Sequence, residues 1–330
     1  MLALALALSL AGSRSAYVAV GASDLGPVEG IGRLVLDRAA QRLFVAHGNR
    51  VLVLDARSGR SLGEVQGAVG AAQGIGLSTL TGQGFTDDGR DGFAIAFDLR
   101  SFKVTKLIST PKGADAIVVE PVSGHVFVLA GGSRAISVID PRNDTVVASI
   151  NTGETVEDAV SDGRGRVFVS GSENRDVLRI DGQSNAVTAR WLTPDCARPH
   201  GLAYDRANQR LFLGCSNSKL LVMDGRSGQV TTELAFGRDL DSVAFDSRHR
   251  RLFSASGADG DITVYQQVLP DKYRALAPFR TALGKQQLVV DPASGTVFVA
   301  VDDAEAPATP NERSKASSGT LRVLMFDPTR

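Results

Sequence analysis

The chain has 330 residues, with 36 lysines and arginines balancing 36 aspartates and glutamates, so its formal net charge is zero. An apolar fraction of 43% excludes a disordered chain, and zero net charge argues against a general nucleic-acid binder, whose cations must neutralise phosphates. Two cysteines exclude a disulfide-rich scaffold and a four-thiolate zinc site.

The first sixteen residues, MLALALALSLAGSRSA, resemble the apolar core and cleavage region of a secretory signal peptide. The apolar run is too short to cross a bilayer, which needs about 20 apolar residues. No lysine or arginine precedes the run, which departs from the usual signal, and an ordinary hydrophobic strand is the alternative. We expect 1–16 to be an export signal, and the mature protein to be periplasmic or secreted without a membrane span.

After residue 16, one sequence unit recurs seven times, and each copy contains a run related to Arg-Leu-Phe-Val-Ala. Neighbouring copies are 41 to 45 residues apart, which is the length of a propeller blade. One such unit cannot bury its apolar faces alone, whereas seven units stacked around an axis can. The phenylalanines that mark the copies are Phe44, Phe85, Phe127, Phe168, Phe212, Phe253 and Phe298.

Each copy shows three strands of alternating apolar and polar residues, and a weaker fourth. The first strand often ends in an acid such as Asp37, and the third ends likewise, as in Val51–Asp55, except in copy six, where it ends at Tyr265. The fourth is visible in runs such as Val104–Ile108. The sequence therefore predicts an all-β fold, a seven-bladed β-propeller of four-stranded antiparallel blades in a single domain over 17–330.

The two ends of the chain suggest how the ring closes. The third strand of copy seven is the last of the chain, while the N-terminal run Tyr17–Val20 has no place in copy one. We expect this run to pair with Leu321–Phe326, which would remove an exposed sheet edge; an untidy terminal strand is the alternative. Copy seven also carries an insert, 302–319, rich in proline, alanine and serine, which we expect to be a flexible flap.

Several runs of the chain carry a resemblance to a known family. They include GFTDDGRDG at Gly84–Gly92, CARPHGLAYD at Cys196–Asp205, RLFLGC at Arg210–Cys215 and DSVAFD at Asp241–Asp246. With them, Tyr17–Arg330 resembles the YncE-like, YVTN-repeat seven-bladed β-propellers, a mostly bacterial exported family. No copy reads Tyr-Val-Thr-Asn, because phenylalanine replaces tyrosine throughout. The resemblance implies an architecture and a periplasmic setting, and it names no catalytic residue.

A candidate site follows from the blade geometry. The position twelve residues before each anchor opens the inner strand at the channel mouth, with copy four one residue shorter. It gives a polar ring of Gln73, Asp115, Glu157, His200, Asp241 and Gln286. The turns between second and third strands lie on the same face and carry a basic rim of Arg50, Arg90, Arg134, Arg175 and Lys219. We expect this face to bind an unknown protein or small-molecule ligand. The alternative is that these polar groups only solvate the end of a water-filled channel.

The sequence lacks a recognisable catalytic constellation, since it has no GxSxG elbow, no HExxH and no phosphate-binding loop. The prediction is therefore a monomeric binding or interaction module without a cofactor. An acidic mouth with one histidine would also suit a divalent cation. The alternative function is a propeller enzyme of the lactone hydrolase or lyase type with such an ion at the channel mouth. A redox partner domain is a third possibility, although no residue pattern here would ligate haem.

Cys196 and Cys215 are nineteen residues apart in copy five, and in an exported protein a disulfide is the expected outcome. A hairpin turning near Ala207 and Asn208 places Cys215 opposite His200, so the loop carrying Cys196 must fold back to reach it. Such a bridge would hold His200 at the ring. A buried pair of free thiols is the alternative.

Overall fold

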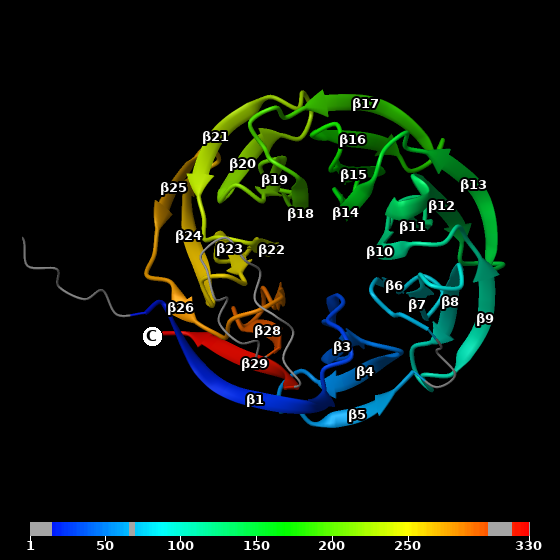
Figure 1. Cartoon of the computed structure of the whole chain (residues 1–330), viewed down its shortest axis with the longest axis horizontal. Helices are drawn as coiled ribbons and strands as arrows, with labels where there is room; N and C mark the ends of the chain where they lie inside the picture. Colours follow the sequence, from blue (N-terminus) through cyan, green and yellow to red (C-terminus); the bar gives the residue numbers. More distant parts are fainter. Residues whose placement is uncertain (1–14, 66–69, 303–318, 330) are drawn as a thin grey trace, which may run out of the picture.

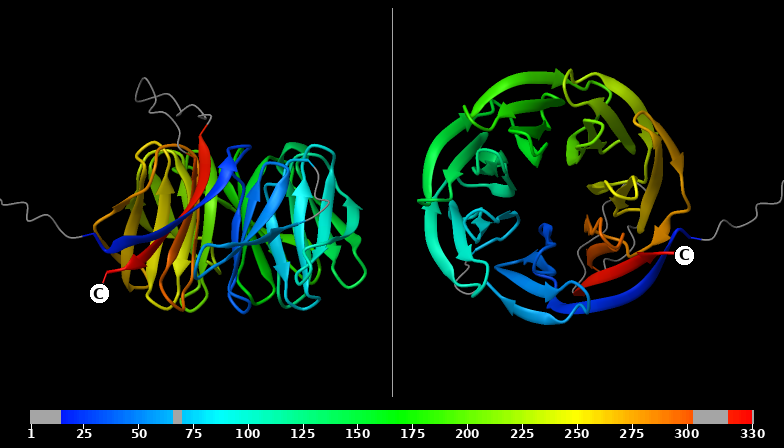
Figure 2. Two further views of the ribbon diagram at one scale, coloured as in Figure 1. Left: turned by 90° about the horizontal axis from the view of Figure 1, so that it is seen from below. Right: turned by 180° about the vertical axis from the view of Figure 1, so that it is seen from behind.

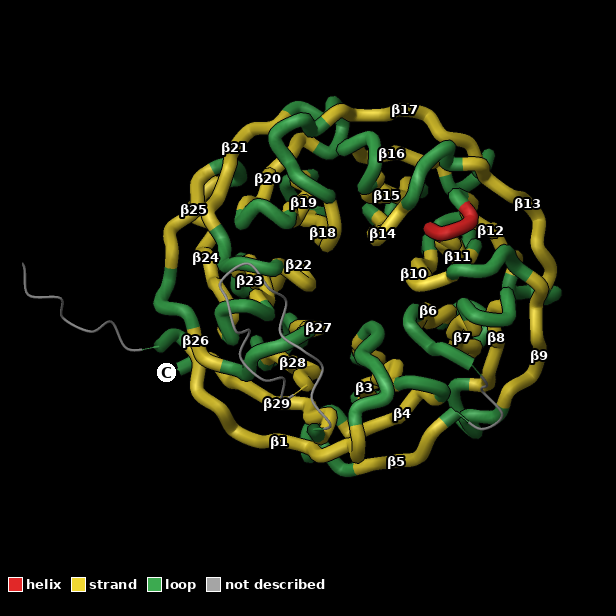
Figure 3. The backbone as a smooth tube through the Cα atoms, viewed as in Figure 1, coloured by secondary structure: helices red, strands yellow, loops and turns green. Residues whose placement is uncertain are grey.

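The computed structural model describes residues 15–65, 70–302 and 319–329, which form seven antiparallel blades around a central axis (Figure 1). The predicted all-β propeller is confirmed. In the described ranges the helical structure consists of one short 3-10 turn, η1 (Gly131–Ser133) (Figure 3). No helix in these ranges is long and apolar enough to cross a membrane. Residues 1–14 of the predicted signal and 303–318 of the predicted insert lie outside the described residues.

The blades follow one another along the chain, and their strands run from the channel to the outer wall. Blade one comprises β2 (Leu34–Asp37), β3 (Arg42–His47), β4 (Arg50–Asp55) and β5 (Ser61–Glu64). Blade two comprises β6 (Ile75–Ser78), β7 (Gln83–Asp88), β8 (Phe93–Asp98) and β9 (Val104–Ser109). Blade three comprises β10 (Ala114–Val119), β11 (Val126–Ala130), β12 (Ala135–Asp140) and β13 (Thr145–Asn151).

The remaining blades repeat this order, with an added strand in blade six. Blade four comprises β14 (Val156–Ser161), β15 (Arg166–Gly171), β16 (Asp176–Asp181) and β17 (Ala186–Leu192). Blade five comprises β18 (Pro199–Asp205), β19 (Arg210–Cys215), β20 (Lys219–Asp224) and β21 (Val230–Ala235). Blade six comprises β22 (Leu240–Asp246), β23 (Arg251–Ser256), β24 (Asp261–Leu269), β25 (Lys272–Ala275) and β26 (Phe279–Arg280). Blade seven comprises β27 (Gln286–Val290), β28 (Val297–Asp302), β29 (Thr320–Pro328) and β1 (Tyr17–Pro27).

The ring closes as the sequence predicts, by pairing of its first and last strands. β1 pairs antiparallel with β29 from Tyr17 opposite Pro328 to Pro27 opposite Thr320, and it forms the outer strand of blade seven. β1 is longer than the predicted run, with 11 residues. Two register shifts accommodate its curvature along the outer wall (Figure 2). The pairing removes the open sheet edges that a broken ring would expose.

The seven anchor phenylalanines fill the interfaces between blades. None exposes more than 3% of its surface, and each belongs to an apolar cluster shared with the following blade. Phe44 of blade one packs with Ile75 and Phe97 of blade two, and Phe298 of blade seven packs with Leu43 of blade one. The core is therefore seven clusters around the ring, one at each junction between blades.

The acids that end the third strands stabilise turns on the face opposite the channel mouth. One carboxylate oxygen of Asp55 accepts hydrogen bonds from the backbone N–H groups of Arg57 and Ser58, at 3.2 and 2.8 Å. The hydroxyl of Ser58 donates to the same oxygen at 2.7 Å. Asp98 accepts the corresponding three hydrogen bonds, from the backbone N–H groups of Arg100 and Ser101 and from the hydroxyl of Ser101. The backbone N–H groups in these turns have no partner on a neighbouring strand, so the carboxylate accepts them instead. This explains why an acid recurs at this position.

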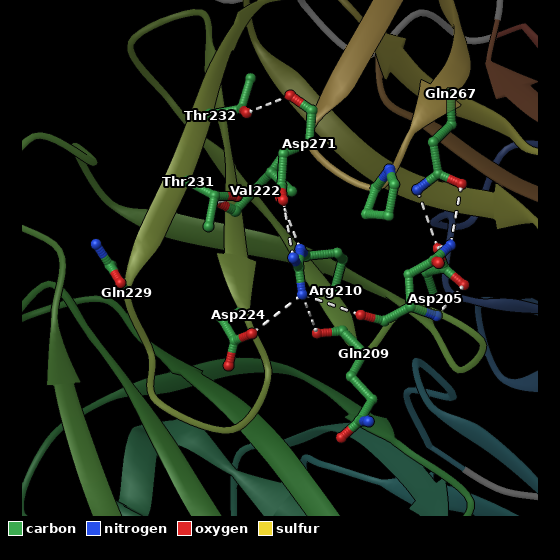
Figure 4. A network of polar contacts seen from close by, with 12 residues as sticks. Asp205, Gln209, Arg210, Val222, Asp224, Gln229, Thr231, Thr232, Gln267 and Asp271 are labelled. Atoms are coloured by element: carbon green, nitrogen blue, oxygen red, sulfur yellow. Dashed lines mark hydrogen bonds and ion pairs between the residues drawn. The ribbon is translucent and has the colours of Figure 1, made fainter.

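Blade six departs from the sequence prediction. Its third strand continues past Tyr265 to Leu269, and the hairpin between β24 and β25 reaches toward blade five. There the guanidinium of Arg210 forms two hydrogen bonds to the carboxylate of Asp271, at 2.7 and 2.8 Å (Figure 4). The hydroxyl of Thr232 donates to the Asp271 carbonyl at 2.9 Å. The longer hairpin thus joins two blades through a paired charge.

The predicted disulfide between Cys196 and Cys215 is present, with Cα atoms 5.1 Å apart. Cys215 lies opposite Pro199, one residue from the expected partner His200. The loop before β18 folds back as required, because the Cys196 N–H donates to the carbonyl of Thr193 at 2.9 Å. The bridge therefore holds the start of the inner strand of blade five.

Replacing Tyr17 with alanine should lower the free energy of unfolding by about 3 to 5 kcal/mol, because the ring is 3% exposed and lies 5.4 Å from Phe253 and 5.1 Å from Phe279. Val18 lies on the same strand and is 51% exposed, so Val18→Ala is the matched control, with an effect within about 0.5 kcal/mol. Denaturant unfolding measures both variants. Equal stabilities would contradict closure of the ring by β1.

Replacing Cys196 and Cys215 together with alanine should lower the free energy of unfolding by about 3 kcal/mol, because the bridge closes a loop of 19 residues in the unfolded chain. Thermal unfolding of the wild-type protein with and without a reductant measures the same quantity independently. A melting temperature that neither reduction nor the double substitution changes would contradict this contribution.

Candidate binding site at the channel mouth

The inner strands of blades three to six all begin with a β-bulge at the channel mouth. In blade three, Ala114 pairs with Ala130 and Ala116 with Leu129, which leaves Asp115 without a partner residue. The same shift occurs at the starts of β14, β18 and β22. A bulge redirects a side chain and ends regular pairing. The repeated bulge therefore presents the first polar residues of these strands to the channel.

Two adjoining hollows of about 300 and 150 Å³ lie at this mouth and share Glu157, His200 and Lys285. The larger is also lined by Arg198, Pro199, Ser216, Asp239, Leu240 and Asp241. The smaller is also lined by Ile31, Gly32, Arg33, Gln73, Asp115 and Gln287. Five of the six predicted ring residues thus lie in one place.

Gln286 is the predicted ring residue that lines neither hollow. Its side chain is fully buried, accepts a hydrogen bond from the Thr281 hydroxyl at 2.8 Å and donates to the carbonyl of Ala282 at 2.6 Å. It therefore holds the segment that enters blade seven. Its neighbour Lys285 is the residue that faces the hollows, so the predicted position is displaced by one residue in this blade.

Arg33 is a second residue that sequence reasoning missed, since the fixed spacing selected Gly32. Its guanidinium reaches from blade one across the ring to Asp158 of blade four, at 2.6 Å, and the two blades lie on opposite sides of the channel (Figure 1). Asp158 also accepts the backbone N–H of Leu202 in blade five, at 2.8 Å. The signal in the sequence was a charged residue directly beside the position selected in blades one, four and seven, at Arg33, Asp158 and Lys285.

Burial at the mouth shifts its acids and bases toward their uncharged forms. Desolvation, followed by the charge of Glu157, raises the pKa of the Asp115 carboxyl to about 8. Desolvation, followed by the charge of Asp239, raises the pKa of Asp241 to about 8. Burial also lowers the pKa of His200 and of Lys285. Both carboxyls therefore carry a proton in much of the population near neutral pH, and a protonated carboxyl donates a hydrogen bond.

One acid at the mouth connects neighbouring blades. The Asp241 carboxylate accepts the backbone N–H of Gln286 at 2.9 Å, which joins blade six to blade seven. Glu157 is bound less tightly, because the imidazole nitrogen of His200 lies 3.7 Å from its carboxylate, beyond the length of a hydrogen bond. The Glu157 side chain is 25% exposed and the His200 side chain 35% exposed. Glu157 and His200 are thus more accessible to a ligand than the bridging acid.

The predicted basic rim lies around this face and outside both hollows. Three of its cations are near carboxylates: Arg50 at 3.8 Å from Glu64, Arg134 at 3.1 Å from Glu173, and Lys219 at 3.1 Å from Glu233. Arg175 donates to the carbonyl of Pro194 at 3.3 Å, and Arg90 is exposed. The rim charges are therefore largely compensated locally, while the cations that face the hollows are Arg33, Arg198 and Lys285.

The described residues contain no group of three or more histidine, cysteine, aspartate or glutamate side chains placed to hold one metal ion.

Comparisons with known proteins support the fold. No family model and no curated protein matches the sequence. Among solved structures, the chain is similar to one described as Kuenenia stuttgartiensis hydrazine synthase, with a TM-score of 0.71 and 15% identity over 88% of this chain and 97% of that chain. It is also similar to one described as U3-55K, with a TM-score of 0.75 and 11% identity over 93% of this chain and 98% of that chain. At such identities the likeness shows the propeller fold alone.

The shifted carboxyl of Asp115 predicts a pH-dependent effect of Asp115→Asn. The folded pKa of about 8 exceeds the ordinary value of 3.8, so the wild-type protein loses stability as the pH rises through this interval. The variant should resemble the wild-type protein at pH near 4 and exceed its unfolding free energy by several kcal/mol, up to about 5, at pH near 8, because each pKa unit corresponds to about 1.4 kcal/mol. Denaturant unfolding at both pH values measures this. A difference that does not change with pH would contradict it.

Proposed function

We propose that this chain is an exported, YncE-like binding propeller that takes a small polar ligand at the channel mouth. The ligand class that fits is a zwitterion, with an ammonium group and a carboxylate. The observation that carries the proposal is the convergence of acids and bases from six blades on two adjoining hollows. No catalytic residue is part of this proposal.

The lining side chains supply complementary groups for both ends of such a ligand. Glu157 offers an accessible carboxylate to an ammonium group, while Lys285 and Arg198 offer cations to a carboxylate. The carboxyl of Asp115, when protonated, donates a further hydrogen bond. A ligand with only one sign of charge would leave part of this lining desolvated and unpaired, which costs binding energy.

Two features support export and the family. A disulfide with both cysteines fully buried suits an oxidising compartment. The leader-like first sixteen residues point the same way. The repeat pattern and the closed seven-bladed ring suit a YncE-like protein.

Calorimetry with three probes tests the ligand class: free glycine as the zwitterion, spermidine as a cation and succinate as an anion. Glycine should bind, and Glu157→Gln should weaken its binding about tenfold or more, because a charged hydrogen bond is lost. Asp195→Asn is the matched control. Asp195 is an exposed acid in the loop before β18, and its side chain lines neither hollow. Equal binding of spermidine or succinate would overturn the zwitterion assignment. Binding of none of the three would favour a mouth that only solvates the channel.

A hydrolytic or lyase activity on lactones is the second candidate, and one observation favours it. The imidazole of His200 has a lowered pKa, caused first by burial, and lies 3.7 Å from Glu157, as suits a general base held near a carboxylate. A lactone panel measured with and without a chelator separates the two functions. Turnover that is lost in His200→Asn would replace the binding proposal.

A further inference from the structure

The face opposite the channel mouth presents arginines. It carries the turns between first and second strands and those between third and fourth strands, and it is the lower edge in the side view of Figure 2, where β29 ends. Exposed arginines in the first set of turns are Arg38, Arg164, Arg206, Arg248 and Arg250. Those in the second set are Arg57, Arg60, Arg100, Arg142 and Arg226. They are distributed over blades one to six, and we call this surface the arginine face.

The acids on this face are turned inward. The strand-ending carboxylates described on this face are buried or half-buried, and many accept backbone N–H groups of their own turn. In the motif Asp-x-Arg-Ser, the aspartate and serine complete the turn, as at Asp55 and Asp98, while the arginine between them projects to solvent. Although the net charge of the chain is zero, the outermost charged groups on this face are therefore guanidinium ions.

Several of these arginines are available to an external anion. Arg60, Arg100 and Arg164 form no ion pair with a described residue at the distances that define the pairs above. Others are paired yet remain open to solvent, since the Arg142 side chain is 53% exposed and that of Arg226 is 65% exposed. Exposed pairs of this kind contribute little and yield readily to a competing anion.

Apolar side chains accompany the arginines on the same face. Leu80 and Val122, in neighbouring turns of blades two and three, are 61% and 64% exposed. Beside them, the inner strands of blades one to three line a largely apolar groove of about 520 Å³ that includes Val35, Leu77 and Val119. Both the Leu80 and the Val122 side chains leave most of their apolar surface in solvent. Arginines beside exposed apolar side chains suit a partner whose surface is anionic and whose next layer is apolar.

We infer that the arginine face docks on an anionic lipid bilayer. The turns end at a similar level along the lower edge of the disc (Figure 2), and the exposed arginines belong to these turns, so one surface can contact many of them together. Phosphate headgroups would meet the ring of arginines, and Leu80 and Val122 would enter the headgroup layer. A soluble polyanion would satisfy the arginines but leave these two apolar side chains without a role. The channel mouth would then face away from the membrane.

Co-sedimentation with vesicles of equimolar phosphatidylglycerol and phosphatidylcholine tests the inference. The protein should bind these vesicles, should not bind pure phosphatidylcholine, and should be released by high salt. The triple variant Arg60→Gln, Arg100→Gln, Arg164→Gln should reduce partitioning about 100-fold, because each arginine at an anionic surface contributes about fivefold. Leu80→Ser with Val122→Ser should weaken binding several-fold without any change in charge.

The matched control removes three exposed cations elsewhere: Lys106→Gln, Lys112→Gln, Arg280→Gln. It has the same net charge as the triple arginine variant and should change partitioning less than about threefold. Circular dichroism confirms that each variant is folded. Equal losses in the two triple variants would show attraction by net charge alone and overturn a specific face. Binding to heparin or an oligonucleotide as tight as to vesicles, and unaffected at Leu80 and Val122, would overturn the lipid assignment in favour of a soluble polyanion.

Discussion

The burial of one phenylalanine at each junction between blades is the constraint on which this ring depends. A four-stranded blade has two apolar faces and cannot bury either alone, so its stability comes from its neighbours. Each anchor, from Phe44 onward, lies on the second strand and packs into a cluster shared with the next blade. The last junction has the same form, because Phe298 packs against blade one. Seven equal junctions hold the inner strands in place, and the channel mouth takes its geometry from them.

Most of the fold could be predicted from the sequence because its determinants are local and repeated. Alternating strands, acids at strand ends and a regular spacing of phenylalanines each have one structural interpretation, and the spare run at Tyr17 indicates closure. The site was harder to place because the inner strands of blades three to six carry a bulge at the mouth, while those of blades one and seven pair without a register shift, so one spacing cannot serve every blade. A fixed spacing therefore selected Gly32 and Gln286, where Arg33 and Lys285 face the hollows. Contacts across the ring, such as that from Arg33 to Asp158, have no signature in a repeat.

The charge that each carboxylate presents depends on the hydrogen-bond donors around it. At the strand ends, acids are used by turn N–H groups, which leaves arginines outermost on one face. At the mouth, acids from the bulges meet few donors and are desolvated, so their protons are retained to higher pH. The composition contains equal numbers of both signs, yet the two faces differ in which sign is accessible and in which state. The sequence shows which acids and bases are present, whereas their hydrogen bonds and burial determine which of them present an accessible charge.

The pairing of β1 with β29 also sets the order of folding. Ser15 and Thr329 are in contact although 314 residues separate them, so the last blade cannot be completed until nearly the whole chain is available. Blades one to six contain only strands adjacent in sequence and can form as the chain emerges, since short loops close at little entropic cost. Until β29 is available, β1 has no partner strand. Ring closure is thus a late event, and a chain truncated near its C-terminus would expose two sheet edges at once.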